Sequence, residues 1–122
     1  MKSFLLVFLG GGLGSAVRYF IARMLNPYAL AFPYATLISN VLACFILGVI
    51  VGTAEERQLI GSSGRLFWAV GFCGGFSTFS TFSHETLSMF NAQFQLMSVL
   101  YIVLSVTLCL MAVFTGQWLV RP

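Results

Sequence analysis

The chain has 122 residues, of which 59% are hydrophobic and only 7% are charged, with a net charge of +3 and a mean hydropathy of +0.97. Soluble domains carry about 25% charged residues, so this composition excludes a soluble globular protein and predicts an integral membrane protein. The positive charge comes from lysine and arginine residues that flank apolar runs, which is typical of membrane anchoring and gives no reason to expect a nucleic acid partner.

Four apolar runs are long enough to cross a bilayer. A span needs roughly 20 apolar residues, and the runs cover about 4–25, 34–53, 67–91 and 96–120. We therefore predict an all-α membrane protein with four transmembrane helices, a single transmembrane domain over 1–122 and no soluble domain. Its function is then expected to take place within the lipid bilayer.

The first run continues past three glycines to Leu25 without a convincing cleavage site, so we interpret it as a retained span and not as a signal peptide. Gly10 and Gly14 have the GxxxG spacing that lets helices pack closely. Arg18 lies well inside the run. Such an arginine pairs with protein groups or lines a wet cavity, or else extends to the nearby interface, and the sequence leaves both interpretations open.

The second run begins after two helix-breaking signals, at Asn26-Pro27 and at Pro33. Its strongly polar residues are the neighbours Ser39 and Asn40. The Asn40 amide offers two N–H donors and one acceptor, so it is a candidate ligand donor. The alternative is an interhelical hydrogen bond that holds the bundle together.

The loop at 54–66 is polar and rich in glycine and serine. With four spans, this loop and both termini lie on one side of the membrane. That side carries most of the basic residues, namely Lys2, Arg57, Arg65 and Arg121 against Arg23 and Arg18. The positive-inside rule favours cytoplasmic termini, but the bias is modest enough to allow insertion in both orientations.

The third run contains the most informative segment, 71–82, which reads GFCGGFSTFSTF. We predict that the helix breaks at the pair Gly74-Gly75, because glycine tolerates unusual backbone conformations. Hydroxyl side chains and evenly spaced rings follow the pair: Ser77, Thr78, Ser80 and Thr81, with Phe76, Phe79 and Phe82. A broken, hydroxyl-rich helix at membrane depth is tolerated where it is buried in protein or lines a cavity. The segment is therefore typical of a permeation or substrate site.

His84 and Glu85 follow this segment. We interpret the pair as the end of the hydrocarbon region in preference to a proton relay. In the fourth run, Tyr101 and Ser105 are four residues apart and share one helix face. Their hydroxyls either face those of the third run or form hydrogen bonds within the core.

The spans offer no paired carboxylates, no metal-ligand cluster and no catalytic triad spacing, so we do not expect an enzyme. The cysteines Cys44, Cys73 and Cys109 are interpreted as small core residues. What the spans do offer is neutral donors beside phenylalanine rings, whose edges are the positive part of the ring quadrupole. That combination suits a small, strongly hydrated anion, because permeation needs weak and multiple sites.

At a helix break, freed backbone carbonyls need a partner in a low-dielectric region. A hard cation such as Na⁺ binds unwound carbonyls in transporters, and the sequence alone does not distinguish this ion from a water molecule. Four helices are too few to enclose a pore and also pack a core. We therefore expect a homo-oligomer, and the weak charge bias favours an antiparallel dimer in which two broken helices meet.

Over its whole length the chain resembles the Fluc (CrcB) family of bacterial fluoride channels. The resemblance rests on three motifs in order: Gly10 to Gly14 with Arg18-Tyr19, Ala35 to Asn40 with Gly48, and Gly71 to Phe82 leading to Glu85. It implies an antiparallel, dual-topology homodimer in the bacterial cytoplasmic (inner) membrane. The dimer would export fluoride passively through two pores and reject chloride.

The resemblance also implies roles for individual residues. Phe79 and Phe82 correspond to the pore phenylalanines and Asn40 to a pore donor. Ser80, Thr81, Tyr101 and Ser105 would supply a polar track beside the rings. A structural Na⁺ at the dimer centre would be bound by the backbone carbonyls of Gly74 and Ser77, with Thr78 as the neighbouring alternative. Arg18 corresponds to a first-span arginine with a structural or vestibular role.

Two other classes of function fit the composition. A small four-helix, proton-coupled multidrug exporter is also an antiparallel dimer, but it needs a carboxylate deep in a span, and Glu85 lies near an end. A structural subunit of a larger membrane complex would use the polar residues only to hold helices together.

Overall fold

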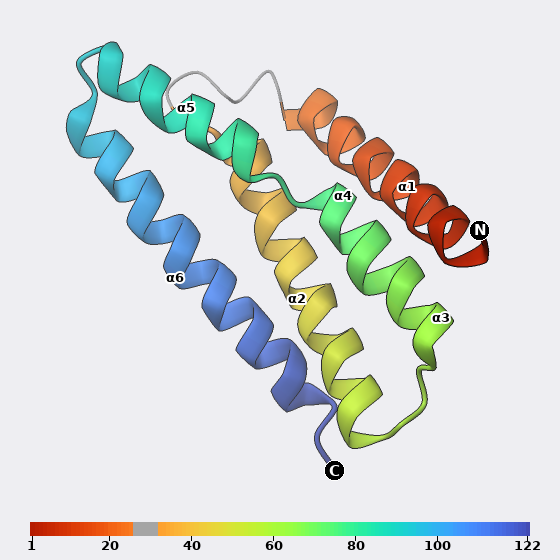
Figure 1. The fold of residues 1–122 in the computed structure, drawn as a ribbon. Helices are drawn as coiled ribbons and strands as arrows, with labels where there is room; N and C mark the ends of the chain where they lie inside the picture. Colours follow the sequence, from red (N-terminus) through yellow and green to blue (C-terminus); the bar gives the residue numbers. More distant parts are fainter. Residues whose placement is uncertain (26–31) are drawn as a thin grey trace.

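The computed structural model describes residues 1–25 and 32–122, and every regular element in these ranges is helical (Figure 1). The elements are α1 (Lys2–Leu25), α2 (Tyr34–Glu56), α3 (Ser62–Arg65), the π-helical segment η2 (Leu66–Cys73), α4 (Gly74–Phe76), α5 (Phe79–Asn91) and α6 (Gln95–Leu119). The predicted helix-breaking pair Asn26-Pro27 lies outside the described residues.

Three of the helices, α1, α2 and α6, are long and apolar enough to cross a membrane by length and composition. The third predicted span is built differently. Segments α3, η2 and α4 follow one another without interruption, and α5 continues after a short extended stretch. The all-helical class predicted from the sequence is confirmed, and the third predicted span consists of two shorter helical parts.

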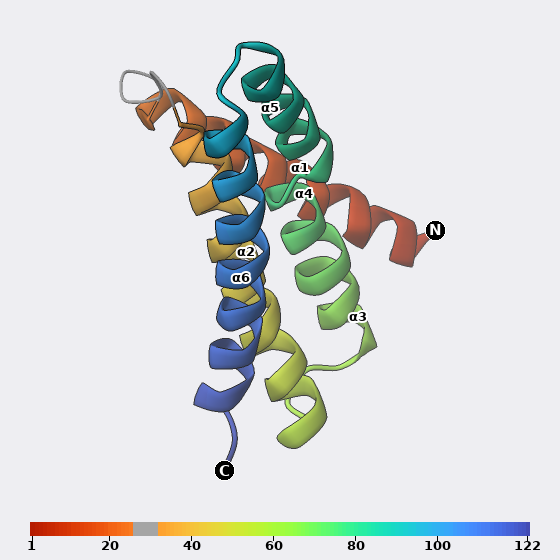
Figure 2. The same ribbon diagram turned by 90° about the vertical axis from the view of Figure 1, so that its left-hand side faces the viewer.

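The helices pack in the order α6, α2, η2 with α4, and α1. Figures 1 and 2 show α2 and α6 side by side and running in the same direction. Glycines set this close spacing, because a Cβ at Gly48 would overlap the Val113 carbonyl and one at Gly116 would overlap the Phe45 carbonyl. On the other side of η2, a Cβ at Gly14 would overlap the Phe72 carbonyl. The GxxxG spacing in α1 thus serves close helix packing, as predicted.

The break in the third span lies at Ser77 and Thr78, and not at Gly74-Gly75 as the sequence predicts. Ser77 and Thr78 have extended backbones, with ψ of 157° and 119°, whereas Gly74 and Gly75 belong to a helical turn. Gly75 is needed for packing, since a Cβ there would overlap the carbonyl of Gly11 in α1. The glycine pair is therefore helical, and the chain extends only after it has passed α1.

The buried positions of α6 are small or polar, and its large apolar side chains point outward. Ser98, Tyr101 and Ser105 are buried at helical spacing, while neighbouring residues such as Val103 and Val106 are more than half exposed. Helix α2 likewise buries Thr36 and Ser39. A soluble protein would place these side chains the other way round, so the pattern indicates lipid outside and a polar interior.

Candidate functional site

Asn40 holds the break in the third span through both ends of its amide. Its Oδ1 accepts a hydrogen bond from the Thr78 N–H at 2.7 Å, and its Nδ2 donates to the Thr78 carbonyl at 3.2 Å. These two bonds replace the helical bonds that the extended backbone has lost, which is required for a break at membrane depth. The interhelical role that the sequence left open for Asn40 is therefore present.

The Thr78 side chain begins the next helix. Its hydroxyl oxygen accepts a hydrogen bond from the Thr81 N–H at 3.2 Å, which caps α5. The Thr78 hydroxyl also donates to the Thr81 hydroxyl at 3.1 Å and lies 3.3 Å from the Ser80 hydroxyl. Three of the hydroxyls singled out in the sequence thus form one cluster at the N-terminus of α5, where backbone N–H groups favour an anion.

The carbonyl groups around the break fall into two sets. The Gly75 carbonyl accepts hydrogen bonds from Ser15 Oγ at 3.3 Å and from Arg18 Nε at 3.2 Å, both in α1. Within the described residues, no hydrogen bond reaches the carbonyl oxygens of Gly74 or Ser77. Gly74 is also exposed. These two oxygens therefore keep their capacity to bind a cation or a donor.

A cavity of about 270 Å³ opens beside the break. Asn40, Ser77 and Thr78 line it together with the side chains of Phe79 and Phe82. The two rings lie 5.5 Å apart between centroids and are tilted by 42°. The remaining lining residues are Cys44, Ser105, Val106 and Cys109. The structure thus brings an amide, hydroxyl side chains and two phenylalanine rings to one small cavity.

Two buried hydroxyls have no hydrogen-bond partner in the described part of the chain. Ser105, 6% exposed, lies on the wall of the cavity beside the rings, and Ser39, with no exposed surface, lies on the wall of a second cavity. A buried hydroxyl without a partner costs about 1–3 kcal/mol. Two such groups next to cavities are therefore available to a bound ligand.

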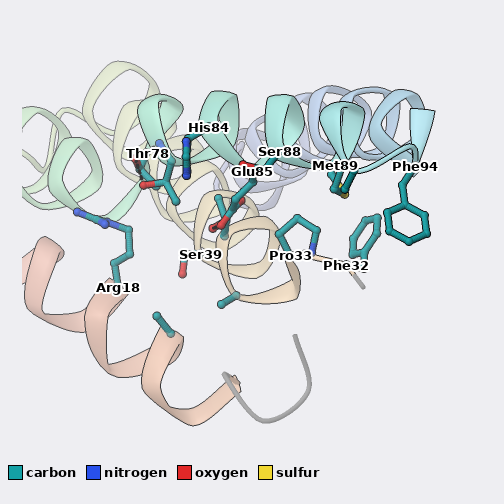
Figure 3. Close-up of a pocket in the computed structure, with 15 residues that line it drawn as sticks. Arg18, Phe32, Pro33, Ser39, Thr78, His84, Glu85, Ser88, Met89 and Phe94 are labelled. Carbon is teal, nitrogen blue, oxygen red and sulfur yellow. Dashed lines mark hydrogen bonds between the residues drawn. The ribbon is translucent and has the colours of Figure 1, made fainter. Parts of the chain in front are cut away.

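The second, larger cavity has a volume of about 520 Å³ and lies between α1, α2 and α5. Figure 3 shows Arg18 extending from α1 toward the side where Thr78 lies, with Ser39 and Glu85 nearer the middle of the view. Thr78 lines both cavities, so the break lies between them. Arg18 consequently takes the cavity-lining role, and not the extension to the interface that was its alternative.

Glu85 and Tyr101 are joined in a way that the sequence did not reveal. The Tyr101 hydroxyl donates to Glu85 Oε2 at 2.8 Å, and the Thr36 hydroxyl donates to Oε1 at 2.7 Å. Glu85 is half-buried, so it does more than mark the end of a span. The sequence did contain a signal for this contact. Small polar residues lie on one face of α2, among them Thr36, and polar residues also lie on one face of α6.

Of the remaining predicted site residues, Thr81 lines a cavity, and Ser80 and Tyr101 do not. Thr81 lines the larger cavity, whereas Ser80 is exposed at the start of α5. Tyr101 has no exposed surface and lines neither cavity, and its ring packs against Phe82 with 5.1 Å between centroids. Tyr101 thus packs against Phe82 and does not itself line the cavity. Its predicted place on a polar track stays a prediction.

Comparison with known proteins points to one family. Residues 5–117 match the model of the family described as CrcB-like protein, Camphor Resistance (CrcB). A protein of Flavobacterium psychrophilum is 40% identical over 95% of this chain and 94% of its own length, and one of Pyrococcus abyssi is 41% identical over 99% and 98%. A third, from Elusimicrobium minutum, is 43% identical over 95% and 91%. Each of the three is named fluoride-specific ion channel FluC.

Proposed function

This chain belongs to the family of CrcB-like proteins, and we propose that it is a multi-pass membrane protein that acts as a fluoride-specific ion channel. It moves fluoride down its electrochemical gradient and so exports the ion from the cytoplasm. It is not an enzyme. We place it in the cytoplasmic (inner) membrane of a bacterium.

The observation that carries this proposal is the unpaired Ser105 hydroxyl on a cavity wall that also holds Asn40 and two phenylalanine rings. Fluoride is small and strongly hydrated, so it enters a protein only where donors replace its water. Neutral hydroxyl and amide donors do this without holding the ion as tightly as a buried lysine, and the positive ring edges add weak attraction. A series of weak sites lets the ion leave again.

The path that we propose passes through both cavities. Arg18 brings a positive charge to the wall of the larger cavity, which Glu85, Ser39 and Thr81 also line. Thr78 lies at the junction, and beyond it the ion meets Asn40, Ser105 and the rings. Ser80 and Tyr101 line neither cavity, and we propose that they support the polar track through their contacts with Thr78 and Phe82.

We further propose an antiparallel, dual-topology homodimer with two pores. Phe79 is 79% exposed on the single chain, and Ser80 and Gly74, which are near it in the sequence, are exposed as well. A ring that lines a pore needs a second wall, and a second copy in the opposite orientation supplies it. Two broken helices then meet in the middle of the membrane, as in the inverted repeats of transporters.

The carbonyl oxygens of Gly74 and Ser77 fit a structural Na⁺ at the centre of this dimer. They are oxygen ligands without hydrogen bonds in the described part of the chain, and the exposed Gly74 would face the partner copy. Thr78 is the less favoured carbonyl, because Asn40 already donates to it. The bound ion would supply positive charge that offsets the backbone dipoles at the break.

The proposal is tested by fluoride efflux from liposomes that contain the purified protein, followed with a fluoride electrode. Efflux should be rapid, should require a potassium ionophore because it is electrogenic, and should slow strongly when Phe79 or Phe82 is replaced by isoleucine. Replacement of Leu110, an exposed residue of α6, by isoleucine is the matched control and should change nothing. Protein that moves no fluoride, or moves chloride equally well, would contradict the proposal.

A second arm tests the cation. Fluoride efflux and dimer stability should both fall when Na⁺ is replaced by a large organic cation, and return when Na⁺ is restored. If efflux and dimer stability are both unchanged in the absence of Na⁺, the proposed Na⁺ site is wrong, while the proposed channel function still stands.

A further inference from the structure

The proposed fluoride path assigns no role to two cysteines on the wall of the smaller cavity. Cys44 projects from α2 and Cys109 from α6, and both are free and half-buried. A thiol is only a weak hydrogen-bond donor, so neither adds much to the donors that surround an anion. The third cysteine, Cys73, is buried and lines neither cavity.

The packing of α2 against α6 sets the two cysteines opposite each other. The helices run in the same direction, with Gly48 against Val113 and Gly52 against Gln117. The same register, carried one turn toward the start of each helix, brings Cys44 beside Cys109. Both side chains line the same cavity of about 270 Å³.

We propose that Cys44 and Cys109 together bind a soft, thiophilic cation of the kind that accepts two sulfur ligands in a line, such as Hg²⁺ or Ag⁺. Thiolates select soft metal ions. Structural zinc needs four ligands, and the described residues contain no group of three or more His, Cys, Asp or Glu side chains that would hold a metal. Two sulfurs without a third ligand suit an ion that needs only two.

Binding of mercury by the pair balances without any redox partner. Near neutral pH and without chloride, Hg²⁺ is present as its neutral dihydroxide, which can enter a cavity lined by uncharged side chains. Two Hg–S bonds form and two Hg–O bonds break, and each thiol proton leaves with a hydroxide as water. The oxidation states of mercury and sulfur do not change.

An ion held between these sulfurs would lie on the wall of the cavity that Asn40, Phe79 and Phe82 also line. We therefore expect it to obstruct fluoride, and this part rests on the proposed channel function. The binding itself does not, so binding and obstruction are measured separately.

Binding is measured by loading the full-length protein with mercuric nitrate, challenging it with excess 2-mercaptoethanol, and counting retained mercury per chain by mass spectrometry. The pair should hold mercury roughly 10²-fold more tightly than one thiol, since the second bond is intramolecular. Cys44→Ser and Cys109→Ser should each lose the metal, and Cys73→Ala should keep it. Retention by either serine variant, or loss by Cys73→Ala, would overturn the site.

Obstruction is measured on the same proteins in liposomes. Mercury should stop fluoride efflux through the unsubstituted protein and leave the Cys44→Ser/Cys109→Ser double variant active. If the pair binds mercury but efflux does not slow, then the pair does not lie beside the pore. Absence of efflux before any mercury is added would contradict the channel function and leave the binding result intact.

Discussion

At the scale of single residues, Asn40 carries two hydrogen bonds that a continuous helix would have made for itself. The amide pairs with both the N–H and the carbonyl of Thr78, and the side chain also lines the smaller cavity. The same amide therefore holds the break and lines the cavity. An amide does both because it is donor and acceptor without charge.

We expect Asn40→Ala to destabilise the protein by about 1–3 kcal/mol, because the Thr78 N–H and carbonyl lose their partners in a water-poor region, and to abolish most fluoride efflux. Thermal unfolding in detergent and the liposome assay measure the two effects. Asn91→Ala, at the exposed end of α5, is the control and should leave both unchanged. Asn40→Ala protein with unchanged efflux would contradict the role of the amide.

Ser105 allows ligand binding to be separated from stability. Its hydroxyl is buried and unpaired, so Ser105→Ala should leave the unfolding temperature unchanged or higher. The variant should nevertheless conduct less, because a hydrogen bond to a charged ligand contributes about 1.5–3 kcal/mol, which is about tenfold or more in affinity.

Ser98 is the matched control for this experiment, because its hydroxyl donates to the Thr86 carbonyl at 2.9 Å and lines neither cavity. Ser98→Ala should lower the unfolding temperature and keep its efflux after correction for folded protein. A Ser105→Ala variant that is less stable and conducts normally would show that the hydroxyl serves the fold alone.

At the scale of elements, the third span depends on close contact between α4 and α1. A Cβ at Gly75 would overlap the Gly11 carbonyl, whereas a Cβ at Gly12 would meet nothing within 4 Å. The backbone of α1 cannot move aside without disturbing the Arg18 and Ser15 bonds to Gly75. Glycine at 75 is therefore a packing requirement.

We expect Gly75→Ala to cost about 1–3 kcal/mol through overpacking and to lower the yield of folded protein. Gly12→Ala, on the exposed face of α1, should be neutral or stabilising by up to about 1 kcal/mol, because alanine favours a helix. Thermal unfolding of both variants in the same detergent measures this contrast. Equal unfolding temperatures would contradict the close approach of α4 to α1.

At the scale of elements, the position of the helix break is a feature that the sequence alone did not predict correctly. A glycine pair indicates either a flexible backbone or a close approach, and local sequence does not separate the two uses. The close approach is made by α1, which lies far away in the chain. Ser77 and Thr78 become the break because Asn40 of α2 supplies the partners that an extended backbone needs.

At the scale of the whole molecule, one chain leaves its candidate site open on one side. Phe79 is 79% exposed, and the uncommitted Gly74 carbonyl is near it in sequence and also belongs to an exposed residue. The even number of predicted spans puts both termini and the connection from α2 to η2, residues 57–65 with the short helix α3, on the same side of the membrane. An antiparallel dimer then requires chains of both orientations in one membrane.

This orientation is measured with a single cysteine placed in α3, the short exposed helix of the connection between α2 and η2. In a variant with Cys44, Cys73 and Cys109 replaced by alanine, Ser63→Cys should be labelled by a membrane-impermeant maleimide in about half of the chains from each face of the membrane. Ser63 is exposed, so the reagent can reach it. Labelling from one face alone would contradict the dual-topology dimer.

Composition and local spacing alone determined that this protein is helical, resides in a membrane and carries neutral donors beside evenly spaced rings. These properties depend on residues that are near each other in the chain, and local periodicity records them. The tertiary structure decided which polar groups are already paired. Tyr101 donates to Glu85, and Arg18 donates to the Gly75 carbonyl, while Ser105 is left free. Such pairings join separate helices, and their register depends on packing that no single segment of sequence contains.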